Sequence, residues 1–297
     1  MEPREAALLL LCCRLGNEAV PLTAAEYRQL AQRVQQSTCT APETELTSAH
    51  LRALGYDAPM RVRILTLLDR REQLCRYLGA HPEVRVLTRI SPGFPQRLRR
   101  LGDHCPAALF LKGDPALLQR PCVSLVGSRR IAPDNRAFAE AVGQQAAREG
   151  YVLVSGGAAG ADRAAQAACL RAGGSVICVV PDALTSYPNR SDMLYCSDEG
   201  YEFVFSAARA LRRNGIIHAL GEKTFVAQSD VDKGGTWAGT TKNLRHGLSE
   251  VYAYADGSEA AARFQAMGAT LLPAAPAQIG TLRPAALSIF DLNLQDR

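Results

Sequence analysis

Features typical of several protein classes are missing from this chain of 297 residues. No apolar run approaches the ~18 residues of a membrane-spanning helix. No segment is of low complexity, and none repeats with a period typical of solenoid proteins. The nine cysteines form no Cys-x-x-Cys pair and have no histidine nearby at metal-ligand spacing. An odd number of cysteines also favours a reducing compartment, so we expect a cytoplasmic protein with no membrane partner and no metal site.

Motifs of common enzymes are missing too. No glycine-lysine-serine or glycine-lysine-threonine triplet marks a Walker loop. Ser155 follows a predicted strand, but Leu153 stands where a nucleophile elbow needs glycine. The five histidines have no evident catalytic partners in the sequence. We therefore expect no catalytic constellation and no cofactor, and a protein that is not an enzyme.

The charge balance is only mildly basic. The sequence has 34 Lys and Arg against 29 Asp and Glu, a formal net charge of +5, and its pI is near 8.8. This balance permits an anionic partner without requiring one. The length suggests about two domains.

The first 80 residues are predicted to form a small helical domain, similar to SAM or helix-hairpin-helix domains. Thr23 and Glu26 make a capping box before apolar residues at helical spacing, and the whole region is typical of a bundle of four short helices. The apolar run from Ala6 to Cys13 has no small-residue cleavage site after it, so we interpret it as a buried helix. The arginines of this region could contact a nucleic acid or form the solvated face of amphipathic helices.

Residues 81–275 alternate between strand and helix patterns. Short apolar runs at 123–126, 151–154 and 176–180 are separated by helical patterns at 134–148 and 161–171, and further strands are expected at 84–87, 109–111, 224–227 and 251–254. This alternation predicts an α/β fold with a doubly wound, Rossmann-like parallel sheet. Residues 276–297 are rich in alanine and proline, and we expect a loosely attached C-terminal tail.

Three glycine-rich loops follow strands of the predicted sheet. They contain Gly127, Ser128 and Arg129; then Ser155, Gly156, Gly157 and, at the helix start, Asp162; and finally Lys233, Gly235 and Thr236. In a doubly wound sheet such loops share one edge, where backbone amides and helix N-termini favour phosphate. Glycines that merely allow tight turns could account for one loop, but three loops with basic residues favour an anion-binding pocket. The dinucleotide interpretation is weak because the first loop lacks the second and third glycines.

Two residues near these loops have alternative interpretations. Asp162 could cap backbone amides at the start of its helix, or it could hold an arginine of the pocket. Trp237, the only tryptophan, could be a platform on which a base stacks, or it could belong to the core.

The motifs, taken in order, resemble those of the DprA (also called Smf) DNA-processing family. The resemblance spans roughly residues 6–272, and its motifs are Phe94-Pro95-Gln96-Arg97-Leu98, Leu109-Phe110 to Gly113-Asp114, Val126 to Arg129, Ser155 to Asp162, Gly173-Gly174, Tyr187-Pro188-Asn189, and Arg213-Asn214-Gly215-Ile216-Ile217. The third loop occupies the place of the family's serine-glycine-serine loop. Gln166 and Gly215 depart from the family's histidine and arginine, and no winged-helix extension is expected because only about 25 residues follow Leu272.

The resemblance implies a protein that binds single-stranded DNA, processes incoming DNA in natural transformation, and helps load the recombinase RecA. It places Arg129 on a phosphate, with Gly127 and Ser128 as donors. It also brings residues from later segments to the same pocket: Asn189, Arg190, Arg213, Asn214 and Lys233. RecA and a second copy of the chain are the implied protein partners.

An alternative function is the binding or processing of a small nucleotide derivative in the same pocket. Phosphoribohydrolases of the LOG type are similar in the third loop, where a glutamate follows the glycines. Here Gly239-Thr240-Thr241-Lys242-Asn243 is followed by no acid until Glu250. That difference argues against hydrolysis but leaves binding open.

Overall fold

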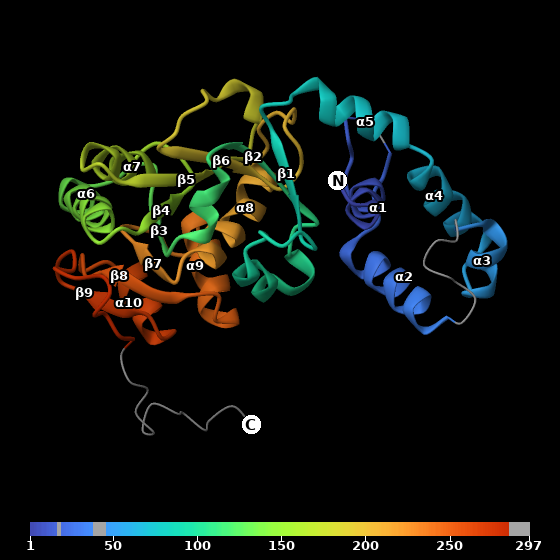
Figure 1. Cartoon of the computed structure of the whole chain (residues 1–297). Helices are drawn as coiled ribbons and strands as arrows, with labels where there is room; N and C mark the ends of the chain where they lie inside the picture. The colour runs from blue at the N-terminus through green and yellow to red at the C-terminus, as the bar shows by residue number, and fades with distance from the viewer. Residues whose placement is uncertain (17–18, 38–45, 285–297) are drawn as a thin grey trace, which may run out of the picture.

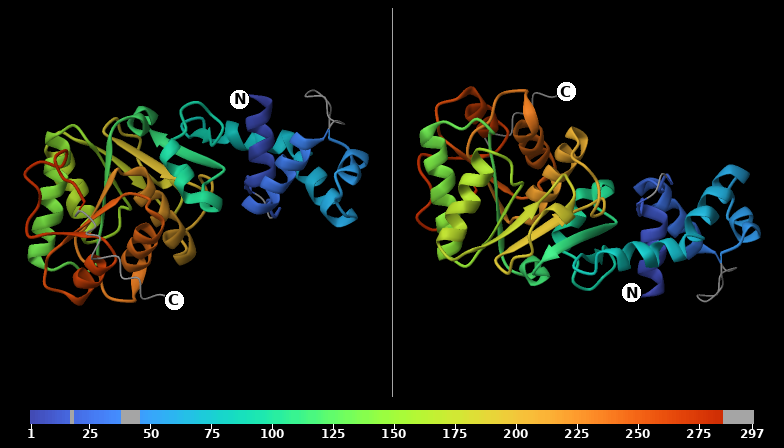
Figure 2. Two further views of the ribbon diagram at one scale, coloured as in Figure 1. Left: turned by 90° about the horizontal axis from the view of Figure 1, so that it is seen from below. Right: turned by 90° about the horizontal axis from the view of Figure 1, so that it is seen from above.

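A computed structural model describes residues 1–16, 19–37 and 46–284. Five short helices form the N-terminal region and lie to one side of a large mixed sheet covered by helices (Figures 1 and 2). Among the described residues, none of the helices combines the length and apolar character needed to cross a lipid bilayer. The cysteines in the described ranges are all free.

The sheet, within the described part of the chain, has nine strands in the order β1-β2-β6-β5-β4-β3-β7-β8-β9. Their bounds are β1 Arg85–Thr88, β2 Ala108–Gly113, β3 Cys122–Val126, β4 Val152–Ser155, β5 Ser175–Val179, β6 Met193–Ser197, β7 Lys223–Val226, β8 Glu250–Tyr254 and β9 Thr270–Leu272. Strands β3 to β9 run parallel, whereas β1 and β2 are antiparallel to their neighbours. The predicted doubly wound α/β fold is confirmed, and the two antiparallel strands at one edge are an addition to it.

Helices cover both faces of the sheet. One face packs α6 (Pro133–Arg148) and α7 (Ala161–Arg171), and the other packs α8 (Ala207–Leu220), α9 (Gly234–His246) and α10 (Glu259–Ala266). Strand residues alternate between the two cores: Val123 and Leu125 of β3 face α6 and α7, while Cys122 and Val126 face the other side. Because the chain winds outward from β3 in both directions, the order of the strands reverses between β3 and β7.

The described residues of the N-terminal region form five helices where the sequence indicated four. They are α1 Pro3–Cys12, α2 Ala24–Gln36, α3 Ser48–Ala53, α4 Ala58–Leu68 and α5 Arg71–Ala80. Arg70 separates α4 from α5, because it leaves helical geometry and its guanidinium donates to main-chain carbonyls of α1 and the residues after it. The predicted capping box of Thr23 and Glu26 begins α2.

The helical region has a small core of its own and also shares the core of the sheet. Leu11, Leu30 and Leu51 pack together away from the sheet. Leu9 and Tyr77 instead join the larger core on the α6 and α7 side. The domain boundary near residue 80 stays a prediction, but α1 and α5 are packed against the sheet rather than tethered to it.

The chain leaves the sheet after β9. In the predicted tail, Ile279 is fully buried, and the backbone amides of Ile279 and Gly280 donate to the Glu149 carboxylate at 2.6 and 2.9 Å. The first residues of that segment are therefore attached to the end of α6. Residues 285–297 of the predicted tail lie outside the described residues.

Short 3-10 helices complete the connections. They span Gln96–His104, Pro115–Gln119 and Leu184–Ser186, and we call them η1, η2 and η3. Within η1, Leu98 and Leu101 are buried against the α8 and α9 side of the sheet. The motif that begins at Phe94 therefore forms part of the core beside the parallel strands.

Candidate functional site

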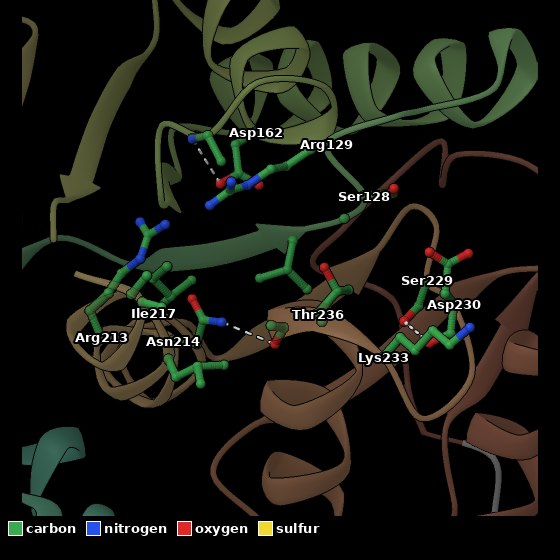
Figure 3. Close-up of a pocket in the computed structure, with 18 of the residues that line it drawn as sticks. Ser128, Arg129, Asp162, Arg213, Asn214, Ile217, Ser229, Asp230, Lys233 and Thr236 are labelled. Atoms are coloured by element: carbon green, nitrogen blue, oxygen red, sulfur yellow. Dashed lines mark hydrogen bonds between the residues drawn. The ribbon is translucent and has the colours of Figure 1, made fainter. Parts of the chain in front are cut away.

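A cavity of about 560 Å³ lies at the carboxyl ends of β3 and β7, where the strand order reverses. This is the position at which open α/β sheets commonly bind ligands. Its walls come from the loop after β3, the loop after β7, the start of α7, the N-terminal part of α9 and the first half of α8 (Figure 3).

Hydrogen bonds join these loops to one another. The backbone amide of Ala161, at the start of α7, donates to the carbonyl of Ser128 at 3.2 Å, so the first and second loops touch. The Asn214 side chain of α8 donates to the Gly235 carbonyl at 3.0 Å, which fixes the start of α9 against α8. The first amides of α9, at Gly234, Gly235 and Thr236, lie in the cavity wall, where helix amides lack helical partners and carry partial positive charge.

Two basic side chains lie on opposite sides of the cavity. Arg129 comes from the loop after β3, and Lys233 precedes α9 (Figure 3). Both are exposed, and within the described part of the chain neither side chain has a hydrogen-bond or ion-pair partner. Asp230 supplies an exposed carboxylate on the Lys233 side. The arrangement offers two unengaged cations, helix amides and the Ser128 and Thr236 hydroxyls to one ligand.

Asp162 lies beneath the first and second loops. Its carboxylate accepts hydrogen bonds from the backbone amides of Gly156 and Ala158, at 3.1 and 3.3 Å. Burial raises its pKa to about 6, against the opposing effect of the nearby Arg213 charge. The amides that Asp162 accepts from belong to the second loop and not to the first turn of α7, whose N-cap residue Gly160 makes no side-chain cap, and Arg213 acts on the carboxylate through charge.

Arg213 reaches the cavity from α8, but its guanidinium is used within the fold. Its Nη1 donates to the carbonyl of Gly156 at 2.5 Å and also to that of Val179. Only 5% of the residue is exposed, and burial lowers its pKa. Arg213 therefore ties α8 to the ends of β4 and β5, and its Nη1 is not available to a ligand in this arrangement.

Most of the sequence-predicted residues meet at this cavity. Those that line it are Gly127, Ser128, Arg129, Asp162, Arg213, Asn214, Lys233, Gly235 and Thr236. The first residues of the second loop lie just behind the wall, whereas Ala158 is part of it. Ser155 is fully buried and its hydroxyl accepts from Gln166 at 2.6 Å, while Gly156 contacts Asp162 and Arg213. Gly157 is not part of the lining either.

Three predicted residues lie elsewhere. Asn189 and Arg190 are exposed in the connection between β5 and β6, outside the cavity lining. The Arg190 guanidinium forms a paired hydrogen bond to Asp192, at 2.6 and 2.8 Å, so the expectation that it joins the pocket is wrong for this structure. Trp237 stacks on Phe264 of α10 with ring centroids 4.9 Å apart, which places it against the core beside α10.

Sequence reasoning missed several residues of the wall. Ser229 and Asp230 follow β7, and they could have been found by asking what lies at the carboxyl end of every parallel strand. Phe205 and Leu211 bring apolar surface to the rim, where 53% and 51% of each residue is exposed. No pattern in the sequence marked them. Within the described ranges, no group of three or more His, Cys, Asp or Glu side chains could hold a metal ion.

Known proteins resemble this chain in sequence over most of its length. DNA processing protein DprA of Bacillus subtilis is 25% identical over 266 residues, which cover 84% of each protein. DNA processing protein DprA of Streptococcus pneumoniae is 34% identical over 156 residues, which cover 48% of this chain and 53% of that protein.

Solved structures agree in fold. The crystal structure of DNA processing protein A from Streptococcus pneumoniae matches with a TM-score of 0.69 at 23% identity, covering 91% of this chain and 93% of that chain. A structure described as showing the single-stranded DNA binding mode of DNA processing protein A from Helicobacter pylori matches with a TM-score of 0.55 at 23% identity, covering 64% and 90%.

The family model described as DNA recombination-mediator protein A matches residues 85–279, a range that begins at β1 and contains the whole sheet and the cavity. Since this match covers well over half of the chain, the protein belongs to the DNA recombination-mediator protein A family, the DprA (Smf) proteins.

Proposed function

We propose that this protein binds single-stranded DNA in the cavity at the β3–β7 switch. The observation that carries the proposal is a pair of cations, Arg129 and Lys233, that face one cavity and have no hydrogen-bond or ion-pair partner among the described residues. The two cations can contact successive phosphates of one strand. Each such contact releases condensed counterions from the nucleic acid, and this release favours binding. The backbone amides at the start of α9 add hydrogen-bond donors that carry partial positive charge.

A single strand suits this site better than a duplex. The cavity is concave, and apolar side chains, Phe205 among them, stand at its rim. Unpaired bases can turn toward such side chains while the backbone follows the cations, whereas bases in a duplex are stacked inside the helix. Among the described residues that line the cavity, none is a nucleophile hydrogen-bonded to an activating base, and we propose capture without chemistry.

The biological role that fits this activity is DNA processing in natural transformation, in which the protein protects incoming strands and helps load RecA. The names of the Bacillus and Streptococcus relatives support DNA processing, and the described binding mode of the Helicobacter protein supports binding of a single strand. Transformation and RecA loading are proposed from the family resemblance. A second copy of the chain is a further proposed partner, and light scattering at several protein concentrations tests it.

Fluorescence anisotropy with labelled oligo-dT tests the central proposal. Affinity should fall steeply between about 50 and 200 mM salt, and a duplex of equal length should bind more weakly. RecA loading is tested separately, as faster RecA assembly on oligo-dT coated with single-strand-binding protein. Absence of salt-dependent binding to oligo-dT would overturn the proposed function.

A small nucleotide is the second candidate ligand, and the cavity volume favours it. About 560 Å³ lies within the range of small-molecule sites. Thermal-shift measurements with mononucleotides and with oligo-dT separate the two candidates, since a ligand that binds the folded state raises the melting temperature. Strong stabilisation by a nucleotide and none by oligo-dT would favour this second function.

A further inference from the structure

The connection between β6 and α8, residues 198–206, touches two distant parts of the molecule. Its last part brings Phe205 to the rim of the cavity, and Ser206 caps α8. Its middle part contacts Tyr77 of α5, in the N-terminal helical region. We call residues 198–206 the connecting segment.

Within this contact, Tyr77 and Tyr201 are joined by ring stacking and by hydrogen bonds. Their rings are stacked with centroids 4.3 Å apart and an interplanar angle of 20°. The Tyr201 hydroxyl donates to the main-chain carbonyl of Tyr77 at 2.9 Å. The backbone amide of Tyr201 lies 3.3 Å from the Tyr77 hydroxyl oxygen, which accepts from it. Both tyrosines are nearly fully buried, with 7% of each exposed.

Glu202 completes the contact from inside the connecting segment. Its Oε2 accepts from the Tyr77 hydroxyl and, at 3.1 Å, from the backbone amide of Tyr201. Gly200 packs against the same hydroxyl so closely that a Cβ there would lie 2.5 Å from it. The Tyr77 hydroxyl thus forms hydrogen bonds with both the backbone and a carboxylate of the connecting segment.

Ion pairs hold the other half of the segment to α8. Arg209 donates to the Glu199 carboxylate and to the Val204 carbonyl, and its guanidinium lies 4.6 Å from the centre of the Phe203 ring. Between these two anchors only Val204 and Phe205 are strongly exposed, at 76% and 53%. Phe205 therefore lies in a segment that Tyr77 contacts on one side and Arg209 on the other.

We propose that Tyr77 of the helical region is a positioning residue for the cavity, holding the connecting segment so that Phe205 forms one wall of the ligand site. This inference rests on the proposed function of the cavity. Tyr77 does not itself line the cavity. When its hydroxyl is removed, the segment samples other conformations, and apparent affinity falls with the fraction of molecules in the competent one.

Tyr77→Phe in the full chain is the direct test, because it removes the hydroxyl and keeps the stacked ring. We expect oligo-dT to bind about fivefold more weakly. Tyr56→Phe is the matched control, since among the described residues the buried Tyr56 hydroxyl has no hydrogen-bond partner. It should bind as the wild type does. Glu202→Gln keeps an acceptor oxygen for Tyr77 and should also bind normally, whereas Glu202→Ala should behave like Tyr77→Phe.

A double-mutant cycle separates positioning from general loss of stability. If Tyr77 acts through Phe205, then Tyr77→Phe should change affinity in the wild-type background and have no further effect when Phe205 is already alanine. Equal effects in the two backgrounds, or wild-type affinity of Tyr77→Phe, would overturn the inference.

Chymotrypsin cleavage within residues 198–206 tests the same inference without DNA. Tyr77→Phe should be cleaved faster there than wild type, and Tyr56→Phe should not. If the wild type binds no oligo-dT, the proposed function fails, and the cleavage rates still decide the positioning role. Equal cleavage of Tyr77→Phe and wild type would overturn that role.

Discussion

The guanidinium of Arg213 lies directly against the backbone of Gly156. It donates to the Gly156 carbonyl at 2.5 Å, and a Cβ placed on Gly156 would lie 2.0 Å from Arg213 Nη1. The two residues are far apart in the sequence, on α8 and at the end of β4. Their contact joins the second glycine loop to the helix that forms one wall of the cavity.

Replacing Arg213 should destabilise the fold rather than act only on binding. Arg213→Ala leaves the buried carbonyls of Gly156 and Val179 without this donor and removes the charge that faces Asp162. We expect a loss of about 3 kcal/mol in the free energy of unfolding, measured by urea denaturation. Arg245→Ala, on the exposed surface of α9, is the control and should change stability by less than about 0.5 kcal/mol. Equal stability of the two variants would contradict this role for Arg213.

Gly156→Ala should be destabilising for a steric reason. The added methyl group overlaps the Arg213 guanidinium, which is buried and has little room to move. A cost of about 2 kcal/mol is expected from the displaced hydrogen bonds and the overpacking. Gly79→Ala is the matched substitution, because a Cβ at Gly79 in α5 meets nothing within 4 Å. It should stabilise the protein by about 0.5 kcal/mol.

The Asp162 carboxyl should make stability depend on pH. Its pKa is about 6 in the fold and 3.8 as the ordinary value, so the folded state holds the proton more tightly than the unfolded chain does. Stability from this group is greatest below pH 4 and is lost as pH rises to about 6, by about 3 kcal/mol. Asp162→Asn keeps an oxygen for the amides of Gly156 and Ala158 and removes the titration. The variant should gain stability relative to wild type between pH 4 and pH 7 in chemical denaturation. A constant difference across that range would refute the assignment.

Arg129→Ala should weaken binding of oligo-dT without lowering stability, because the side chain is exposed and has no partner within the described residues. Losing one phosphate contact should reduce the slope of log affinity against log salt by about 0.7. Arg130→Ala is the neighbouring control, since Arg130 is exposed and does not line the cavity. Equal effects of the two substitutions would show that net charge alone governs binding.

The sequence predicted the central parallel strands better than the details of the pocket. Strands around Val123, Val154 and Ile177 were recognisable because buried parallel strands are continuous apolar runs bounded by glycine. Strand β6 was missed. Its five residues stand between polar stretches, and its antiparallel pairing of Ser197 with Phe110 depends on a segment far away in the chain.

Arginines show what the sequence could not predict. Arg129, Arg190 and Arg213 all lie in or next to motifs of the family resemblance, yet Arg129 lines the cavity without a hydrogen-bond partner among the described residues, Arg190 pairs with Asp192, and Arg213 is buried beneath a loop. The partner of each arginine depends on which carbonyl or carboxylate oxygen the folded chain places within hydrogen-bond distance of its guanidinium. Tertiary packing decides this, and the local sequence does not. Phe205 is similar, because it lies at the rim on a connecting segment that also contacts Tyr77, more than a hundred residues earlier.

The central place of β3 in the sheet bears on how the protein becomes able to bind during synthesis. The first loop follows β3, but the cavity also needs β7 and the start of α9, which leave the ribosome much later. A nascent chain that ends before β7 lacks the lining residues from Ser229 to Thr236, even if β3 to β6 have already paired. Contacts of such long sequence separation form late in folding. Binding of single-stranded DNA therefore requires that the sheet has formed on both sides of β3.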